Sequence, residues 1–99
     1  MENETLNWAE TQARLFQVLT NPRRVLILMA LAERERSVGE IAALVGTSMQ
    51  NTSQHLRIMK KRGFLNSRRE GQTIYYCIAD LPLLKSIDLF MASKKSIKT

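Results

Sequence analysis

Two segments in the first third of the chain carry hydrophobic residues at helical spacing. Between residues 6 and 19 the hydrophobic positions recur every three or four residues, which predicts an amphipathic helix over about 6–19. Asn21 and Pro22 then suit the cap and the first turn of a second helix. Residues 25–31 are hydrophobic on nearly every side of that helix, so we expect it at the centre of the core.

The pattern changes twice between residues 33 and 45. Residues 33–36 are all charged and interrupt the helical period, which predicts a short exposed connection. Ser37 and Glu40 match a capping box, in which each side chain binds a free backbone N–H at a helix start. We therefore expect a third helix that begins after Ser37 and ends at about Val45.

A fourth helix follows after a tight turn. Gly46 can adopt the left-handed conformation that such a turn requires, and Thr47 or Ser48 can cap the next helix. That helix is expected to continue to Arg62, where Gly63 closes it. Two helices joined in this way indicate a helix-turn-helix unit, although any two packed helices of a small domain share the same hydrophobic spacing.

The hydrophobic period becomes alternating after this helix. Residues 64–70 and 73–79 flank Gly71 and Gln72, and the second run is rich in β-branched and aromatic residues, so a β-hairpin is predicted. A last helix is predicted over about 81–93. Four helices, a hairpin and a fifth helix form a mainly α winged helix-turn-helix, with one domain over residues 1–99.

The first and last predicted helices carry hydrophobic stripes that one small core cannot fully cover. A chain of 99 residues buries a smaller share of its surface than a larger domain does, so association of two copies is favoured. We therefore expect a homodimer. The residues expected at its interface are Leu6, Ala9, Phe16, Leu84, Ile87, Phe90 and Met91.

The charge balance favours a polyanionic partner, with nucleic acid ahead of an anionic membrane surface. Fifteen Lys and Arg against nine Asp and Glu give a net charge of +6, which by itself also fits a protein that only gains solubility. The predicted fourth helix has no acidic residue, and its amides and hydroxyls, which suit base edges, precede cations that suit phosphates. An ordinary solvated face would carry acids as well. The candidate DNA-binding residues of this helix and the hairpin are Thr47, Ser48, Gln50, Asn51, Ser53, Gln54, His55, Arg57, Lys60, Lys61, Arg68, Arg69 and Gln72.

Two single residues raise the question of other chemistry. His55, the only histidine, is expected chiefly as a hydrogen-bonded packing residue, with a contact at the groove edge as a second interpretation. Cys77 is the only cysteine and alternates with inward residues of the hairpin, so it is expected to be partly exposed. Neither has a second ligand beside it, and we expect no metal, no cofactor and no enzymatic activity.

The chain shows no signal for export or membrane insertion. Residues 1–8 are acidic, and the longest hydrophobic run, residues 25–32, falls far short of the roughly 20 residues that cross a bilayer. A cytoplasmic protein without a membrane partner is expected. A non-enzymatic adaptor that binds proteins through its hydrophobic helix faces is the alternative from a different functional class.

Four stretches resemble the ArsR/SmtB family of bacterial regulators, and within it the HlyU-like branch, which does not sense metals. They are NPRRVLIL at 21–28, SVGEI at 37–41, SQHL at 53–56 and GFLNSRREGQTIYY at 63–76. The resemblance implies a dimer built on the first and fifth helices, a reading helix in the fourth and a wing in the hairpin. It also implies repression by occupation of a palindromic promoter operator, or activation by relief of silencing, with an unknown inducer or silencing protein as a further partner.

The chain departs from the metal-sensing members of this family. Those members carry a Cys-x-Cys pair at the start of the third helix, where this chain has SVGEI, or Asp and His sets on the fifth helix. Here the fifth helix has Asp88 and no histidine, and the paired cysteines of thiol-sensing branches are also missing. The inducer therefore stays open.

Overall fold

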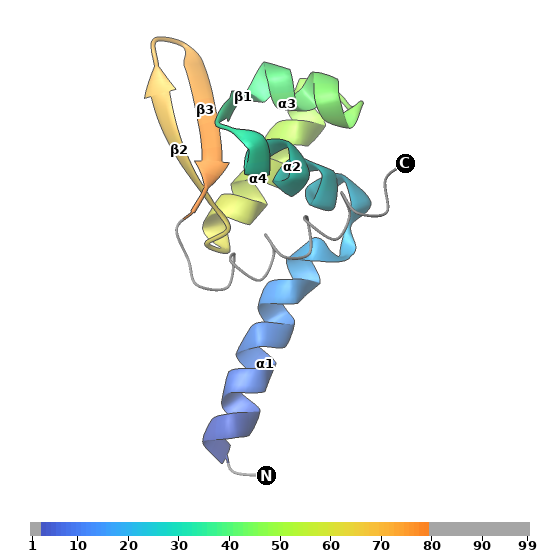
Figure 1. The fold of residues 1–99 in the computed structure, drawn as a ribbon, viewed down its shortest axis with the longest axis vertical. Helices are drawn as coiled ribbons and strands as arrows, with labels where there is room; N and C mark the ends of the chain where they lie inside the picture. Colours follow the sequence, from blue (N-terminus) through green and yellow to red (C-terminus); the bar gives the residue numbers. More distant parts are fainter. Residues whose placement is uncertain (1–2, 80–99) are drawn as a thin grey trace.

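The computed structural model describes residues 3–79, in which three helices and a small sheet surround one core and a further helix extends away from it (Figure 1). The elements in chain order are α1 (Asn3–Gln17), η1 (Val18–Thr20), α2 (Pro22–Glu33), β1 (Arg36–Ser37), α3 (Val38–Val45), α4 (Met49–Lys61), β2 (Leu65–Glu70) and β3 (Thr73–Ile78). The predicted winged helix-turn-helix is confirmed. The predicted last helix, over about 81–93, lies outside the described residues.

The first helix begins three residues before the predicted start. Glu4 lies in its first turn, where a negative charge is favoured by the helix dipole, so the helix extends beyond the hydrophobic stripe. Its end tightens into the 3₁₀ turn η1, where the Thr20 hydroxyl donates to the carbonyl of Gln17 at 2.8 Å. None of the 15 residues of α1 is buried, and the helix projects from the rest of the protein (Figure 1).

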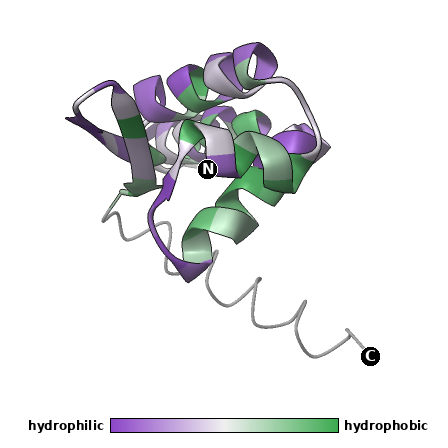
Figure 2. Ribbon diagram, turned by 90° about the horizontal axis from the view of Figure 1, so that it is seen from above, coloured by the Kyte–Doolittle hydropathy of each residue, from purple (hydrophilic) through white to green (hydrophobic). Residues whose placement is uncertain are grey.

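Helix α2 forms the centre of the core, as its hydrophobic pattern predicts. The Asn21 side chain accepts hydrogen bonds from the backbone N–H groups of Arg23 and Arg24, at 2.9 and 3.4 Å, and Pro22 occupies the first helical position. Hydrophobic residues gather on the central helices, whereas much of the hairpin is hydrophilic (Figure 2). The fully buried large side chains are Ile27, Leu28, Ile41, Thr52, Leu56, Met59, Phe64 and Leu65.

The sheet has three strands, and the short exposed connection predicted over residues 33–36 is reduced to residues 34 and 35, because Glu33 ends α2 and Arg36 begins β1. Arg36 and Ser37 form β1 and pair antiparallel with Tyr76 and Tyr75 of β3, which gives the strand order β1-β3-β2. A two-residue polar strand carries no alternation of its own. It forms because the chain leaving α2 passes beside the free edge of β3, whose backbone groups need partners.

The capping box at the start of α3 is confirmed. The Ser37 hydroxyl accepts from the N–H of Glu40 at 3.2 Å, and the Glu40 carboxylate accepts from the N–H of Ser37 at 3.0 Å. Arg34 adds an ion pair to the same carboxylate at 2.8 Å. Together, with the Ser37 backbone hydrogen bond as the largest cause, these contacts lower the pKa of Glu40 from 4.5 to about 2.

We expect Glu40→Ala to destabilise the protein at pH 7 and to have a smaller effect in acid. Because the folded-state pKa is lowered, the contribution of Glu40 is complete above pH 4.5 and is lost as the pH falls toward about 2. Urea unfolding of the wild-type and variant proteins between pH 7 and pH 3 measures the difference. Glu40→Gln, which keeps an acceptor for the Ser37 N–H without a charge, is the control, and a difference between wild type and Glu40→Ala that does not change with pH contradicts the interpretation.

No single helix within residues 3–79 is long and hydrophobic enough to span a membrane, and the segments Asn3–Thr20 and Pro22–Glu33 meet those requirements only as a pair bent by 93°.

Candidate nucleic-acid interface

The turn between α3 and α4 is held by the start of α2. Gly46 has a φ of +67° and donates its N–H to the carbonyl of Ala42 at 3.0 Å, as expected for a glycine that ends a helix. Arg23 donates from Nη1 to the carbonyl oxygens of Val45 at 2.7 Å and Gly46 at 3.2 Å. A cation is favourable at this helix end, so Arg23 helps to fix the geometry from which α4 begins.

Helix α4 divides into a buried and an exposed side. Its cap is Ser48, whose hydroxyl accepts from the N–H of Asn51 at 3.0 Å. Thr52, Leu56 and Met59 are fully buried and anchor the helix to the core. The exposed side presents most of the site residues that were predicted within α4, and these are Gln50, Asn51, Gln54, Arg57, Lys60 and Lys61.

His55 connects α4 to the core instead of facing solvent. It is half-buried, and its Nδ1 accepts a hydrogen bond from Arg24 Nε at 3.1 Å. Burial is the main cause that lowers the pKa of His55, and the positive charges of Arg24 and Arg23 lower it further. The histidine is therefore neutral at neutral pH and joins α2 to α4, which supports its interpretation as a packing residue.

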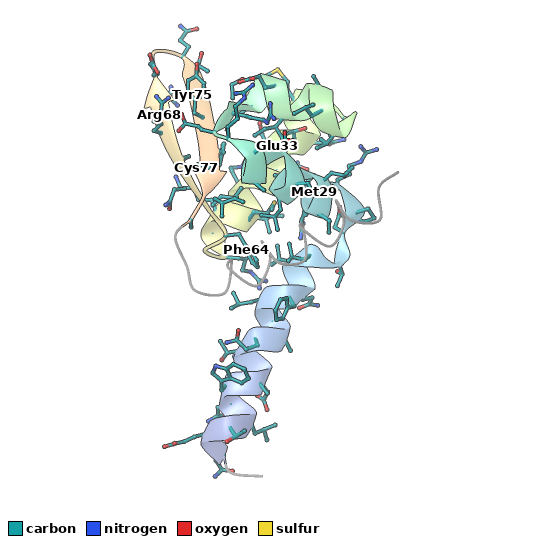
Figure 3. The ribbon with its side chains drawn as sticks, viewed as in Figure 1. Met29, Glu33, Phe64, Arg68, Tyr75 and Cys77 are labelled. Atoms are coloured by element: carbon teal, nitrogen blue, oxygen red, sulfur yellow. The ribbon has the colours of Figure 1, made fainter. Side chains whose placement is uncertain are left out.

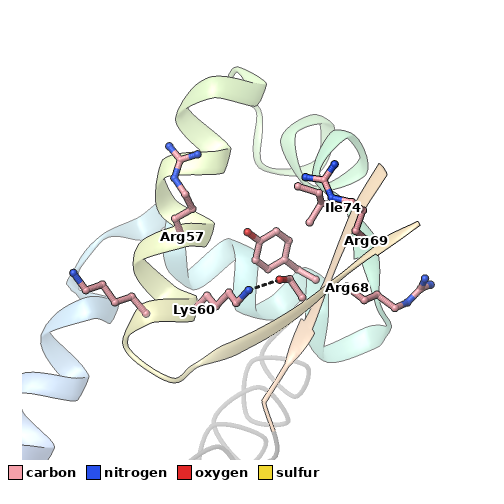
Figure 4. A pocket seen from close by; sticks show the side chains of 8 residues that line it. Arg57, Lys60, Arg68, Arg69 and Ile74 are labelled. Atoms are coloured by element: carbon pink, nitrogen blue, oxygen red, sulfur yellow. Dashed lines mark hydrogen bonds between the residues drawn. The ribbon is translucent and has the colours of Figure 1, made fainter. Parts of the chain in front are cut away.

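A basic cavity separates α4 from the wing. Its volume is about 660 Å³, and Lys60 Nζ donates to the Ser67 hydroxyl at 2.7 Å across it (Figure 4). Tyr76 forms part of its wall, and burial raises the pKa of the phenol, which stays uncharged at neutral pH. The residues that line the cavity are Arg57, Lys60, Lys61, Ser67, Arg68, Arg69, Ile74 and Tyr76. The set contains five cations and no acid, and the four that are not ion-paired to a carboxylate, Arg57, Lys60, Lys61 and Arg69, suit the phosphates of a polyanion.

The two wing arginines, which the sequence treats as equivalent neighbours, lie on opposite faces of the sheet. Arg69 pairs with Ile74 across the hairpin, on the face toward α4, whereas Arg68 pairs with Tyr75 on the other face. Figure 4 shows Arg68 extending away from the cavity, and Figure 3 shows it beside Tyr75. The Arg68 side chain is bound to Glu35 and Glu70, so its surroundings differ from those of Arg69.

The tip of the wing and the start of α4 share a second cavity, of about 370 Å³. Gln72, predicted for the site, lines it from the tip, and half-buried Ser53 lines it from α4. Thr47, also half-buried, precedes the capping residue. The structure therefore brings most of the predicted residues of helix and hairpin to one side of the protein, whereas Arg68 lies on the other face of the sheet and His55 is bonded to Arg24 of α2.

Met49 is exposed at this cavity and was not among the predicted residues. It lies three positions before Thr52 and ten before Met59, so helical spacing assigns it to the buried stripe. It is nevertheless 58% exposed because it is the first residue of α4 and lies beyond the edge of the core. No pattern in the sequence distinguishes such an end position from a core position.

Of the residues predicted for the dimer interface, the structure describes only those on α1. Leu6 and Phe16 on α1 are each 46% exposed, and Ala9 is exposed beside them. Leu84, Ile87, Phe90 and Met91 lie outside the described residues. Cys77 is half-buried, and within residues 3–79 no three His, Cys, Asp or Glu side chains come together in a group that could hold a metal ion.

Comparison with known proteins assigns the family. Residues 21–67 match the model of the bacterial regulatory proteins of the arsR family. The nodulation protein NolR of Rhizobium meliloti is 39% identical over 77 residues, which are 78% of this chain and 63% of NolR, so the chain spans less than two thirds of that relative. The transcriptional activator HlyU of Vibrio cholerae is 35% identical over 76% of this chain and 69% of its own length.

Solved structures agree with this assignment. Reduced HlyU from Vibrio cholerae superposes with a TM-score of 0.82 at 31% identity, covering 89% of this chain and 93% of that one. A homodimeric winged helix-turn-helix DNA-binding domain from Mycobacterium bovis gives a TM-score of 0.80 at 29% identity, covering 100% and 92%. HlyU is named a transcriptional activator, and the Mycobacterium bovis domain is described as a possible ArsR-family transcriptional regulator. The chain therefore belongs to the ArsR family and is a transcriptional regulator with a DNA-binding winged helix-turn-helix.

Proposed function

We propose that the protein binds double-stranded DNA as a homodimer, with α4 of each protomer in the major groove and the β2–β3 wing against the adjacent backbone. The observation that carries this proposal is the exposed side of α4, which has no acid and continues into the basic cavity. Gln50, Asn51 and Gln54 offer paired donors and acceptors that suit adenine edges. Arg57, Lys60, Lys61 and Arg69 are placed for phosphates.

The dimer proposal is supported by α1. A projecting helix with exposed Leu6, Trp8 and Phe16 leaves hydrophobic area in water that a second copy can cover. The relative from Mycobacterium bovis is described as homodimeric. A two-fold protein places its two reading helices about one turn of DNA apart, so the proposed operator is palindromic.

Repression by occupancy is the regulatory mode we propose for this protein in the cytoplasm. A bound dimer would cover promoter DNA that the polymerase needs, and this mode requires only the proposed DNA-binding side. HlyU is named a transcriptional activator, so displacement of a silencing protein from the same DNA is the second candidate. A promoter fusion in cells with and without the gene separates the two, because reporter output rises on deletion only if the protein represses.

The decisive test of DNA binding is a titration against duplex fragments taken from the promoters of the source genome. We expect strong binding to one or a few fragments, weaker binding to random duplexes, and affinity that falls steeply between 50 and 200 mM salt, as about 6–10 phosphate contacts require. Binding that shows neither sequence preference nor salt dependence would contradict the proposal. An adaptor that binds proteins would behave in that way.

DNA binding is expected to need neither a metal nor a thiol switch. Cys77 and His55 lie on separate elements, β3 and α4, and a tight divalent site needs three or four ligands. We expect affinity for the best fragment to change by less than about tenfold after chelation, after zinc addition, and in Cys77→Ser under reducing and oxidising conditions. A larger change in any of these measurements would show that an inducer acts through metal or thiol chemistry.

A further inference from the structure

The face of the wing that points away from α4 carries a compact set of charged contacts. Arg68 donates from Nε to the two carboxylate oxygens of Glu35 at 3.2 and 3.0 Å, and from Nη2 to Glu35 Oε1 at 2.7 Å. Its Nη1 donates to Glu70 at 2.8 Å. The guanidinium carbon lies 4.5 Å from the centre of the Tyr75 ring (Figure 3). Such a stacked, bidentate arrangement restricts an arginine far more than a single surface ion pair does.

The strand register shows which strands the contacts of Arg68 connect. Arg68 lies opposite Tyr75, and Tyr75 lies opposite Ser37, so the three residues share one face of the sheet. Glu35 precedes Ser37 by two positions, which places it on the same face. The strands β1 and β2 are separated by β3 in the sheet. The Arg68 side chain therefore passes over the central strand and joins the two outer edges of the sheet.

Glu35 belongs to a segment that is itself held in place. The preceding Arg34 is paired with Glu40 at 2.8 Å, and the following Arg36 is paired with Glu33 at 2.6 Å. Arg36 Nε also donates to the carbonyl of Ala30 in α2 at 2.9 Å. Glu35 lies between α2 and α3, and α3 is the first helix of the helix-turn-helix. The contacts of Arg68 with Glu35 therefore connect the wing to the start of the helix-turn-helix.

This geometry separates the roles of the two wing arginines. Each of the three nitrogens of the Arg68 guanidinium is bonded to a carboxylate, and a phosphate would have to displace one of them beside two negative charges. Both arginines border the basic cavity, but Arg69 pairs with Ile74 on the face toward α4, whereas Arg68 pairs with Tyr75 on the other face and extends away from the cavity (Figure 4). We infer that Arg68 is a positioning residue that holds the wing at its angle to α4 through Glu35, whereas Arg69 makes the phosphate contact. The inference rests on the proposed DNA-binding function.

For Glu35→Gln, long-range electrostatics and the proposed positioning role predict opposite changes in DNA affinity. The substitution adds one unit of positive charge per protomer, so long-range attraction to DNA alone would strengthen binding. If Glu35 holds the wing through Arg68, we expect affinity for the preferred fragment to fall about threefold to tenfold, with thermal unfolding nearly unchanged. Unchanged or tighter binding would overturn the inference, because it would mean that Glu35 only competes with DNA for Arg68.

Exchange of the two charges provides a second test. Arg68→Glu is expected to weaken binding at least tenfold, and adding Glu35→Arg is expected to restore most of the loss, since the link between the outer strands is formed again with reversed polarity. A direct phosphate contact at position 68 cannot be restored in this way. The control is Arg68→Glu with Glu4→Arg, which has the same net charge but places the new arginine on α1 and not opposite the glutamate at position 68. Equal restoration by the control would overturn the inference.

Salt dependence distinguishes positioning from contact. Arg69→Gln should reduce the slope of log affinity against log salt by about 0.9 for each lost phosphate contact, about two units for a dimer. Arg68→Gln should lower affinity with less than half of that change in slope, and equal slope changes would overturn the inference. A wild-type protein that binds no duplex would overturn the proposed function, whereas normal wild-type binding with an inert Glu35→Gln would overturn this inference alone.

Discussion

Replacing Leu6 and Phe16 together with glutamate is expected to give a monomer that has lost at least about a hundredfold in affinity for a palindromic site. Both side chains are exposed on α1, which contributes no buried residue to the core of its own protomer, so the variant should fold. Two half-sites held by one dimer bind about 10²–10⁴ times more tightly than one alone, because the second contact is made within the same complex. Sedimentation at micromolar concentration should show one chain mass instead of two.

The control adds the same charges to the polar side of α1. Asn7 and Thr11 lie there, and the Thr11 hydroxyl donates to the Asn7 carbonyl at 3.0 Å and accepts from Arg14 at 3.3 Å. Asn7→Glu with Thr11→Glu should leave the dimer intact and should lower affinity only by the general effect of added negative charge. A Leu6 and Phe16 variant that stays dimeric, or a monomer that still binds a palindrome tightly, would refute α1 as the dimer element.

The parts of the fold that the sequence predicts are those set by neighbouring residues. The Asn21 cap and Pro22, the Ser37–Glu40 capping box, and the left-handed glycines at 46 and 63 are all present as expected. Each depends on side chains within four residues, which act before any distant segment is placed. The boundaries of α2, α3, α4 and the hairpin therefore match the predicted ones closely.

The parts that escape prediction depend on residues far apart in the chain. Strand β1 exists only because Arg36 and Ser37 meet β3 nearly forty residues later. Arg68 and Arg69 are neighbours of the same type, and only the pairing register places one against Glu35 and the other beside α4. Hydrophobic period and local caps carry no information on such contacts. Met49 is a different case. Its helical spacing predicts burial, but its side chain is exposed because it is the first residue of α4.

The two sides of α4 show how fold and proposed function share one helix. Leu56 and Met59 on the buried side lie in the hydrophobic core, and the half-buried His55 is bonded to Arg24 of α2. On the exposed side, Lys60 is bonded to Ser67 of the wing, whereas the side-chain amides make no hydrogen bond within residues 3–79 and so hold no other part of the described fold in place. Changes to these amides should therefore alter DNA binding without altering stability, which makes them suitable for a sharp test.

Asn51→Ala and Gln54→Ala are each expected to cost about 1–3 kcal/mol per reading contact on the preferred DNA fragment and much less on random duplex. Both side chains are exposed and lie three residues apart, so they point to the same side of the helix. A carboxamide can pair with both polar atoms of an adenine edge, and its loss leaves those atoms without a partner. Paired titrations against the preferred and the random duplex measure the two costs.

The matched control for this prediction is Asn66→Ala, which removes an exposed amide from β2, on the sheet face away from α4. It should leave both affinities unchanged, and none of the three variants should alter thermal unfolding. Gln54→Met, which keeps the length of the side chain and removes its donors and acceptor, should resemble Gln54→Ala if hydrogen bonding carries the recognition. Equal losses on preferred and random DNA would mean that these amides do not read bases, and the sequence preference would then have to come from the shape of the DNA.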